Sequence, residues 1–185
     1  MKLPAQRMNE VVQQVEQEGV VACPAEAVWG LTCDPLSEDA VLQLLAMKHR
    51  PISKGLIILA ASSAMLGPLL KPLDSAQRNE LELSWPGPNT WLVPNRGLYP
   101  DWITGESDEI AIRVTSAPAL ALLSYRLGRP VVSTSANPAG AQPARHSFQV
   151  VRYFGRGLVR APGVVDLEAS PSTIRRVGTG EVLRA

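Results

Sequence analysis

The chain has 185 residues, of which 45% are hydrophobic and 19% are charged, and its formal net charge is +1. These values are typical of a folded globular protein and exclude a disordered chain, and the net charge does not favour nucleic-acid binding. No apolar run reaches the roughly 18 residues that span a bilayer, and the N-terminus lacks the apolar core of a secretory signal. We therefore expect a single cytoplasmic domain over residues 1–185, with no membrane contact.

The first fifty residues predict helix, strand and helix. Four apolar residues recur at helical spacing before the stop signal Gly19, namely Met8, Val11, Val12 and Val15. Residues 20–23 form a continuous apolar run, which indicates a buried strand. Ser37 can cap a second helix that ends near Lys48. Only two cysteines are present, Cys23 and Cys33, and without a second pair we expect buried free thiols rather than a zinc site.

The middle of the chain alternates between further strands and short helices. Residues 62–84 resemble two short helices separated by Pro72. Apolar or alternating runs predict strands at 55–60, 90–93 and 109–114. The segment 99–107 is expected to be a loop.

The last third predicts two helices and several short strands. A helix is expected over 117–127 with Gly128 as its stop, and another over 149–154. A strand at 130–133 and short strands near Leu158, Ile174 and Val182 complete the pattern. Because several strands follow each other without an intervening helix, we expect an α/β (α+β) domain. Its large twisted mixed sheet would be flanked by helices, unlike a doubly wound nucleotide fold.

The common motifs of covalent and nucleotide chemistry are absent. The sequence has no GxxxxGK[ST] phosphate loop, no GxGxxG fingerprint and no GxSxG nucleophile elbow. It has two histidines, His49 and His146. So few histidines disfavour a histidine-based catalytic triad or metal centre. An enzyme with this sequence would act through positioning and electrostatics.

One short basic stretch carries candidate phosphate ligands. Lys48 and Arg50 are separated by one residue, and Lys54 follows four residues later. Together they could neutralise phosphate oxygens. The alternative is a basic helix end that is favoured by the helix dipole.

A second polar stretch follows the apolar run at 130–132. It contains Ser133, Thr134, Ser135 and Asn137, whose hydroxyls and backbone amides could bind phosphate or carboxylate. A serine- and threonine-rich turn that satisfies its own backbone is the alternative. Arg113, near the end of an apolar strand, needs an anionic partner, which is either an internal carboxylate or a bound ligand.

Taken together, these stretches resemble the YrdC-like threonylcarbamoyl-AMP synthases, and most closely their short, single-domain bacterial form. The resemblance rests on Lys54 and on seven segments in the family's order: 24–31, 48–51, 85–88, 111–114, 133–137, 171–174 and 180–184. Where the family often reads Pro-Thr-Glu-Thr, this chain has Ala25 and Ala27 in place of the two hydroxyl residues.

The resemblance implies a nucleotidyltransferase reaction. L-threonine and bicarbonate would give N-carboxythreonine, whose carboxylate attacks the α-phosphate of ATP and releases pyrophosphate. ATP would be a substrate, Mg²⁺ would accompany its phosphates, and no metal would be held by the protein alone. The product would pass to a separate transferase complex for threonylcarbamoyladenosine modification of tRNA.

The resemblance also implies roles for individual residues. Lys48 and Arg50 would be catalytic through the ATP phosphates. The remaining ATP contacts would come from Lys54, Ser135, Asn137 and Arg184. Threonine would be bound by Arg113, Ser133 and Ser172.

An RNA-binding module without turnover is the alternative from another class. A basic concave sheet could follow double-stranded RNA or bind a ribosome. Weak RNA contact is also open for an enzyme. The net charge of +1 and the presence of only two Phe and three Tyr argue against a dedicated RNA module.

Overall fold

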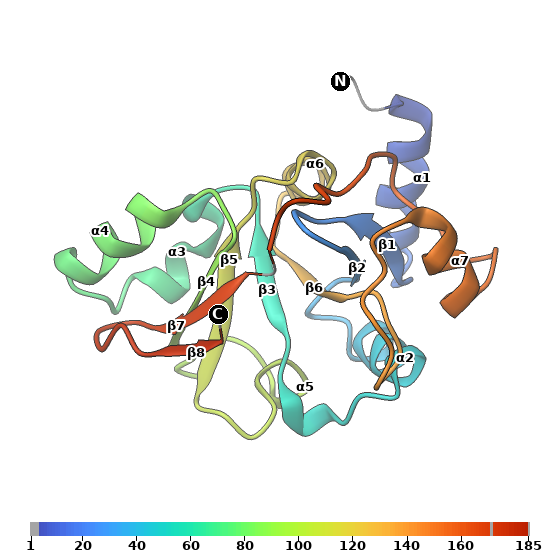
Figure 1. The fold of residues 1–185 in the computed structure, drawn as a ribbon. Coiled ribbons are helices and arrows are strands. Elements are labelled where there is room, and N and C mark those ends of the chain that lie inside the picture. Colours follow the sequence, from blue (N-terminus) through green and yellow to red (C-terminus); the bar gives the residue numbers. More distant parts are fainter. Residues whose placement is uncertain (1–3, 171, 185) are drawn as a thin grey trace.

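Eight strands form one mixed sheet in the computed structural model, which describes residues 4–170 and 172–184. The strand order is β1-β2-β6-β3-β5-β4-β7-β8, and the pairs β3–β5 and β4–β7 are parallel. The strands are β1 (Val21–Pro24), β2 (Trp29–Thr32), β3 (Ile57–Ala60), β4 (Asn89–Pro94), β5 (Glu109–Val114), β6 (Val131–Ser135), β7 (Thr173–Arg176) and β8 (Val182–Arg184). The predicted twisted mixed sheet is confirmed (Figure 1).

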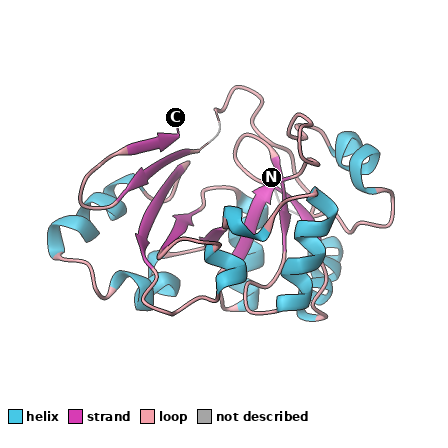
Figure 2. Cartoon of the chain, turned by 90° about the horizontal axis from the view of Figure 1, so that it is seen from below, coloured by secondary structure: helices cyan, strands magenta, loops and turns pink. Residues whose placement is uncertain are grey.

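Seven α-helices and two 3₁₀ turns surround this sheet in the described residues. The helices are α1 (Ala5–Glu16), α2 (Glu38–Lys48), α3 (Gly67–Leu70), α4 (Ser75–Ser84), α5 (Asp101–Thr104), α6 (Pro118–Leu127) and α7 (Ser147–Phe154). The 3₁₀ turns are η1 (Ile52–Lys54) and η2 (Ser63–Leu66). The strands fan out in Figure 2, where most helices lie along the lower border and α7 stands apart.

Alternation along the strands divides the apolar side chains between two cores. On one face, Ile58, Ile112 and Val132 belong to a large core that also receives the apolar face of α2. On the other face, Leu59 and Val131 pack against the apolar faces of α1 and α6. The helices α1 and α6 cover only one end of this second face. The other end of the same face carries the polar groups of the site.

The end of α2 explains the spacing of the two cations Lys48 and Arg50. Ser37 caps the helix by accepting a hydrogen bond from the Ala40 amide at 3.3 Å. His49 follows Lys48 in a left-handed conformation with φ 51° and ψ 42°, and the Arg50 amide donates back to the Leu45 carbonyl at 3.0 Å. This is a Schellman-type helix end. It reverses the chain, so Lys48 stays beneath the sheet while Arg50 leaves toward the open face.

The structure differs from the sequence analysis at three elements. The strand β2 was not predicted, because its four residues include Gly30 and Trp29 without a clear alternation. Part of the loop expected at 99–107 is the short helix α5. No strand forms near Leu158; instead, Arg160 makes an isolated bridge with Ala22.

The remaining predictions of single elements agree with the structure within a few residues. Cys23 and Cys33 are free and buried, as predicted. Burial raises the pKa of the Cys23 thiol to about 12, which makes it a packing group rather than a nucleophile. Across 4–170 and 172–184, no helix combines the length and hydropathy that a membrane crossing requires.

Candidate functional site

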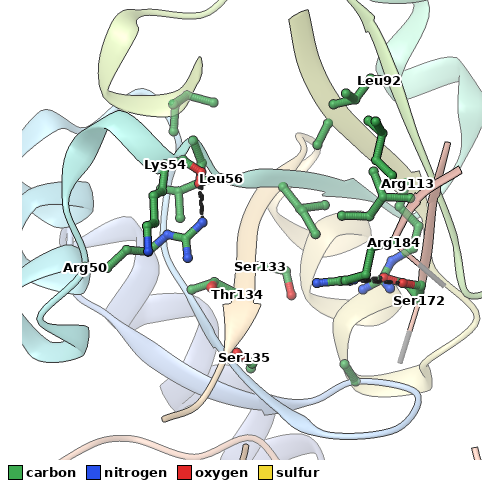
Figure 3. A pocket seen from close by; sticks show the side chains of 18 of the residues that line it. Arg50, Lys54, Leu56, Leu92, Arg113, Ser133, Thr134, Ser135, Ser172 and Arg184 are labelled. Carbon is green, nitrogen blue, oxygen red and sulfur yellow. Dashed lines mark hydrogen bonds between the residues drawn. The ribbon is translucent and has the colours of Figure 1, made fainter. Parts of the chain in front are cut away.

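A pocket of about 650 Å³ opens on the face of the sheet that α1 and α6 leave uncovered. Residues on adjacent strands that share this face form its floor: Gly30, Ile57, Leu92, Ala111, Arg113 and Ser133. Figure 3 shows Arg50 and Lys54 on one wall, Arg113, Arg184 and Ser172 on the opposite wall, and Ser133–Thr134–Ser135 between them. The pocket therefore offers cations from two sides and hydroxyls from the middle.

Gly30 allows β2 to approach the hydroxyl cluster of β6. A Cβ at this position would lie 3.2 Å from Ser133 Oγ and 3.2 Å from the Thr134 carbonyl oxygen. Such contacts are tight for a side chain, so glycine keeps the floor of the pocket open here. Ser133 and Ser135 lie within β6, whereas the sequence placed Ser135 beyond the strand.

The two polar stretches identified in the sequence meet in space. The buried ammonium of Lys48 donates hydrogen bonds to the carbonyl oxygens of Ser135 and Asn137, the latter at 3.0 Å. The Ala139 amide in turn donates to the Lys48 carbonyl at 2.8 Å. Lys48 and Asn137 do not line the pocket. They hold the end of β6 in place from behind, so Lys48 acts on the pocket through Ser135.

The charge of Lys48 should impose a pH dependence on the activity that the resemblance implies. Burial, and then the neighbouring Arg50, lower the pKa of Lys48 from 10.5 to about 8. We expect turnover to fall as pH rises through about 8, because the neutral amine donates more weakly to the two carbonyls. The folded chain releases this proton before the unfolded chain does, so the free energy of unfolding should rise between pH 8 and 10.5.

The measurements are kcat against pH and urea unfolding at several pH values. Lys48→Met should lose both the alkaline limb near pH 8 and this contribution to the unfolding free energy. Lys71→Met is the matched control, because Lys71 is exposed and lies outside the pocket. An alkaline limb that survives unchanged in Lys48→Met would assign it to another group.

Arg50 is anchored by backbone carbonyls in the turn that follows it. Its Nη2 donates to the carbonyl oxygens of Lys54 and Gly55, each at 2.9 Å. Its Nε is buried and has no hydrogen-bond partner among the described residues. A buried donor without a partner is uncommon in native proteins. This makes Arg50, which lines the pocket, a candidate for binding a ligand.

A close backbone approach fixes the turn that holds Arg50. A Cβ on Gly105, whose φ is +66°, would lie 2.3 Å from the Ser53 carbonyl oxygen and 2.8 Å from the Gly55 nitrogen. The Leu56 amide also donates to the Ile103 carbonyl at 2.8 Å. The segment around α5 therefore supports the carbonyls that Arg50 uses.

Gly105→Ala should weaken the use of ATP that the resemblance implies, and it should destabilise the fold. The left-handed conformation costs roughly 1–3 kcal/mol for a residue with a Cβ, and the contact with Ser53 must also be relieved by displacing the turn. We expect the KM for ATP to rise about tenfold or more, because small displacements of a binding group are costly. Gly128→Ala is the matched control, with φ +68° and nothing within 4 Å of the added Cβ. It should lose stability without a change in the KM for ATP.

Arg113 and Glu26 face each other on the opposite wall. Arg113 is 7% exposed, and its Nη2 lies 3.5 Å from Glu26 Oε2. Burial lowers the pKa of Arg113, Glu26 opposes this shift, and Arg184 adds to it. The anionic partner that the sequence required for Arg113 is thus an internal carboxylate, and the guanidinium still borders the pocket.

Arg184 reaches the pocket from the outer strand β8. Its Nη2 donates to the Ser172 carbonyl and to Ser172 Oγ, both at 3.0 Å. Thr90 Oγ1, which is buried, donates to the same Ser172 Oγ at 3.3 Å. These contacts tie β8 to β4 and present the Arg184 guanidinium to the pocket. Ser172 belongs to the segment 171–174 that supports the family resemblance, and the first residue of that segment, Pro171, lies outside the described residues.

The arginines of the two walls are close enough to interact. Burial lowers the pKa of Arg50, and the charge of Arg184 lowers it further. Arg184 likewise acts on Arg113. A polyanion placed between these guanidiniums would relieve their mutual repulsion, so the pocket favours a multiply charged ligand. Within 4–170 and 172–184, no group of three or more His, Cys, Asp or Glu side chains could hold a metal ion.

The structure brings together seven of the nine predicted site residues, which line one pocket: Arg50, Lys54, Arg113, Ser133, Ser135, Ser172 and Arg184. Sequence reasoning assigned no role to Glu26, although it lay in the recognised segment 24–31. The expectation that Arg113 needs an anionic partner was the one sequence observation that could have indicated Glu26. No local pattern connected two residues so far apart in the chain.

A pocket of this size with cations on two walls is typical of a site for a small anionic molecule, and the comparisons with known proteins agree with this class. The family model Sua5_yciO_yrdC, described as "Telomere recombination", matches residues 13–185. A threonylcarbamoyl-AMP synthase from Cellvibrio japonicus is 50% identical over 179 residues, which cover 96% of this chain and 95% of that protein. The chain therefore belongs to the Sua5–YciO–YrdC family, among its threonylcarbamoyl-AMP synthases.

Solved structures agree with this assignment. P. abyssi Sua5 complexed with L-threonine has a TM-score of 0.88 and 27% identity, and the match covers 100% of this chain and 55% of that chain. This chain thus spans about half of the P. abyssi protein. E. coli YciO has a TM-score of 0.84 at 21% identity and covers 98% of this chain and 90% of its own, which supports the fold.

Proposed function

We propose that the pocket between Arg50 and Arg113 binds ATP and L-threonine and makes threonylcarbamoyl-AMP there. L-threonine and bicarbonate first give N-carboxythreonine and water. An oxygen of the new carboxylate then attacks the α-phosphorus of ATP, the bond to the bridging oxygen breaks, and pyrophosphate leaves. The protein supplies no nucleophile in these two reaction steps, which agrees with the absence of motifs for covalent catalysis from its amino-acid sequence.

The arrangement of charge in the pocket is the observation that carries this proposal. Arg50 and Lys54 on one wall suit the phosphates, and Arg184 suits the nucleotide from the other side. Ser135 offers a hydroxyl between the walls, while Lys48 and Asn137 hold its strand end from behind.

The opposite wall suits the amino acid. Arg113 can bind the threonine carboxylate through its planar fork. Ser133 and Ser172 lie on the same pocket surface and are the proposed polar contacts of threonine. Ala25 and Ala27 also line the pocket near Glu26, so this part of the surface offers methyl groups rather than hydroxyls.

Mg²⁺ would enter the pocket on the ATP phosphates and neutralise charge as pyrophosphate departs. The two carboxylates that line the pocket, Glu26 and Glu109, each face an arginine, at 3.5 Å and 3.1 Å. The residues present therefore fit a metal that is held by the substrate. Arg50 and Arg184 would share the work of charge neutralisation.

The proposed setting is the cytoplasm, where ATP, threonine and tRNA are available. The product would pass to a separate tRNA threonylcarbamoyl-transferase complex, with transient contact between the two. Weak RNA contact is part of this proposal. We also propose that residues 1–185 form one YrdC-like domain.

Pyrophosphate release by the purified protein tests the proposal. ATP is supplied with threonine and bicarbonate together, with each alone, and with neither. We expect release that requires both, with threonylcarbamoyl-AMP identified by mass. Release that is independent of threonine would contradict the proposed amino acid site, and no release with all substrates present would contradict the proposed reaction.

A further inference from the structure

Glu26 lines the pocket, and its two carboxylate oxygens differ in their partners. Oε1 accepts hydrogen bonds from Thr115 Oγ1 at 2.7 Å and from the Ser116 amide at 3.1 Å. Oε2 is buried and has no hydrogen-bond partner among the described residues. A buried carboxylate oxygen without a donor is costly, so it indicates a ligand donor.

The neighbouring Arg113 has a hydrogen-bond donor that lacks an acceptor. Arg113 Nε is also buried without a hydrogen-bond partner in the part of the chain that the structure describes. The 3.5 Å between Arg113 Nη2 and Glu26 Oε2 exceeds the usual range of a hydrogen bond. An unused cationic donor and an unused anionic acceptor therefore lie side by side on one wall of the pocket.

An α-amino acid carries the matching pair of groups on one carbon atom. From this juxtaposition we propose that Glu26 binds the substrate's amino group while Arg113 binds its carboxylate, so that the wall recognises a zwitterion. This inference rests on the proposed function for the identity of the amino acid. After carboxylation the nitrogen keeps one N–H, which Glu26 Oε2 can still accept.

The opposite charges of the pair also set selectivity. A monocarboxylate without an amino group would satisfy Arg113 but would place its charge near Glu26 and leave Oε2 without a donor. An amine without a carboxylate would leave Arg113 without a ligand acceptor. Each partial ligand thus leaves a buried group unpaired, which weakens binding strongly.

Calorimetric binding of three probes to Glu26→Gln tests this proposal. The probes are L-threonine, 3-hydroxybutyrate, which lacks the amino group, and threoninol, which lacks the carboxylate. We expect threonine and threoninol to bind about tenfold more weakly than to the unmodified protein. Binding of 3-hydroxybutyrate should be unchanged or stronger, because a competing negative charge has been removed.

If Glu26 contacts the ligand, Glu26→Gln weakens the binding of threonine but not that of 3-hydroxybutyrate. A purely structural role would weaken the binding of both probes. Equal weakening of threonine and 3-hydroxybutyrate would overturn the proposal, as would unchanged threonine binding. Asp34→Asn is the matched control, because Asp34 pairs with Arg129 at 2.8 Å outside the pocket. If Glu26→Gln does not fold, Glu26→Asp withdraws the oxygen by one methylene and should weaken threonine and spare 3-hydroxybutyrate.

The binding test is independent of turnover. A protein that binds threonine in preference to 3-hydroxybutyrate but releases no pyrophosphate would retain the role of Glu26 and lose the proposed reaction. A protein that turns over threonine, with the same preference in Glu26→Gln, would retain the reaction and lose the role of Glu26.

Discussion

Arg50→Ala should lower kcat about 10²- to 10³-fold while the protein remains folded. Removing one preorganised donor to a developing negative charge has an effect of this size in other enzymes. Arg50 and Arg184 both contribute positive charge to the pocket and interact electrostatically. The substitution of Arg50 therefore removes positive charge at the end of the pocket that is proposed to bind phosphate. Only the carbonyl acceptors of Lys54 and Gly55 lose a partner, and the turn remains fixed by its backbone contacts.

The measurement is steady-state pyrophosphate release with saturating ATP, together with thermal unfolding. Arg126→Ala is the matched control, because Arg126 is exposed and donates to Asn9 Oδ1 at 2.8 Å far from the pocket. Arg50→Lys should recover part of the activity, since it restores a charge without the planar fork. Near-normal kcat in a folded Arg50→Ala protein would remove Arg50 from the phosphate site.

Arg113→Ala should raise the KM for threonine by roughly 30-fold or more, with a much smaller effect on the KM for ATP. Truncating one member of a buried charge pair typically costs about 2–5 kcal/mol. The substitution also leaves Glu26 without its cation. Thr115 and Ser116 still donate to Glu26, which limits the loss of stability.

Initial rates at varied threonine and fixed ATP, and the reverse, measure the two KM values. Arg129→Ala is the control, since it removes an arginine from a carboxylate pair outside the pocket. Arg113→Lys keeps the charge in case the alanine variant is unstable, and it should show the same direction. An unchanged KM for threonine in both variants would show that Arg113 is not its carboxylate partner.

The sequence predicted the local elements of this fold well where periodicity and caps act over a few residues. Ser37, the apolar face of α2 and the cation at its end were enough to define that helix. The strand β2 was not predicted because Gly30 has no side chain to contribute to an alternating pattern. Glycine at this position allows β2 to approach Ser133 of β6 closely. The helix α5 is a single turn, too short for periodicity to reveal.

The sequence likewise supplied the candidate phosphate ligands and hydroxyls. It could not separate residues that line the pocket from those that support it. Lys48 and Arg50 differ in this respect because the left-handed His49 sends their side chains to different places. Whether Lys48 reaches a ligand or a carbonyl depends on the position of Ser135, which only the packing of β6 against β2 and β3 decides.

By itself, then, the sequence determined the class of fold, the chemistry on offer and, through its resemblance to a family, the reaction. Those properties depend on residue type and on short spacing along the chain. Tertiary structure alone decided the pairing of Glu26 with Arg113, which are far apart in sequence. It also decided the support of Arg50 by the Gly105 turn. Both result from contacts between distant segments, whose geometry is set by how the strands order themselves in the sheet.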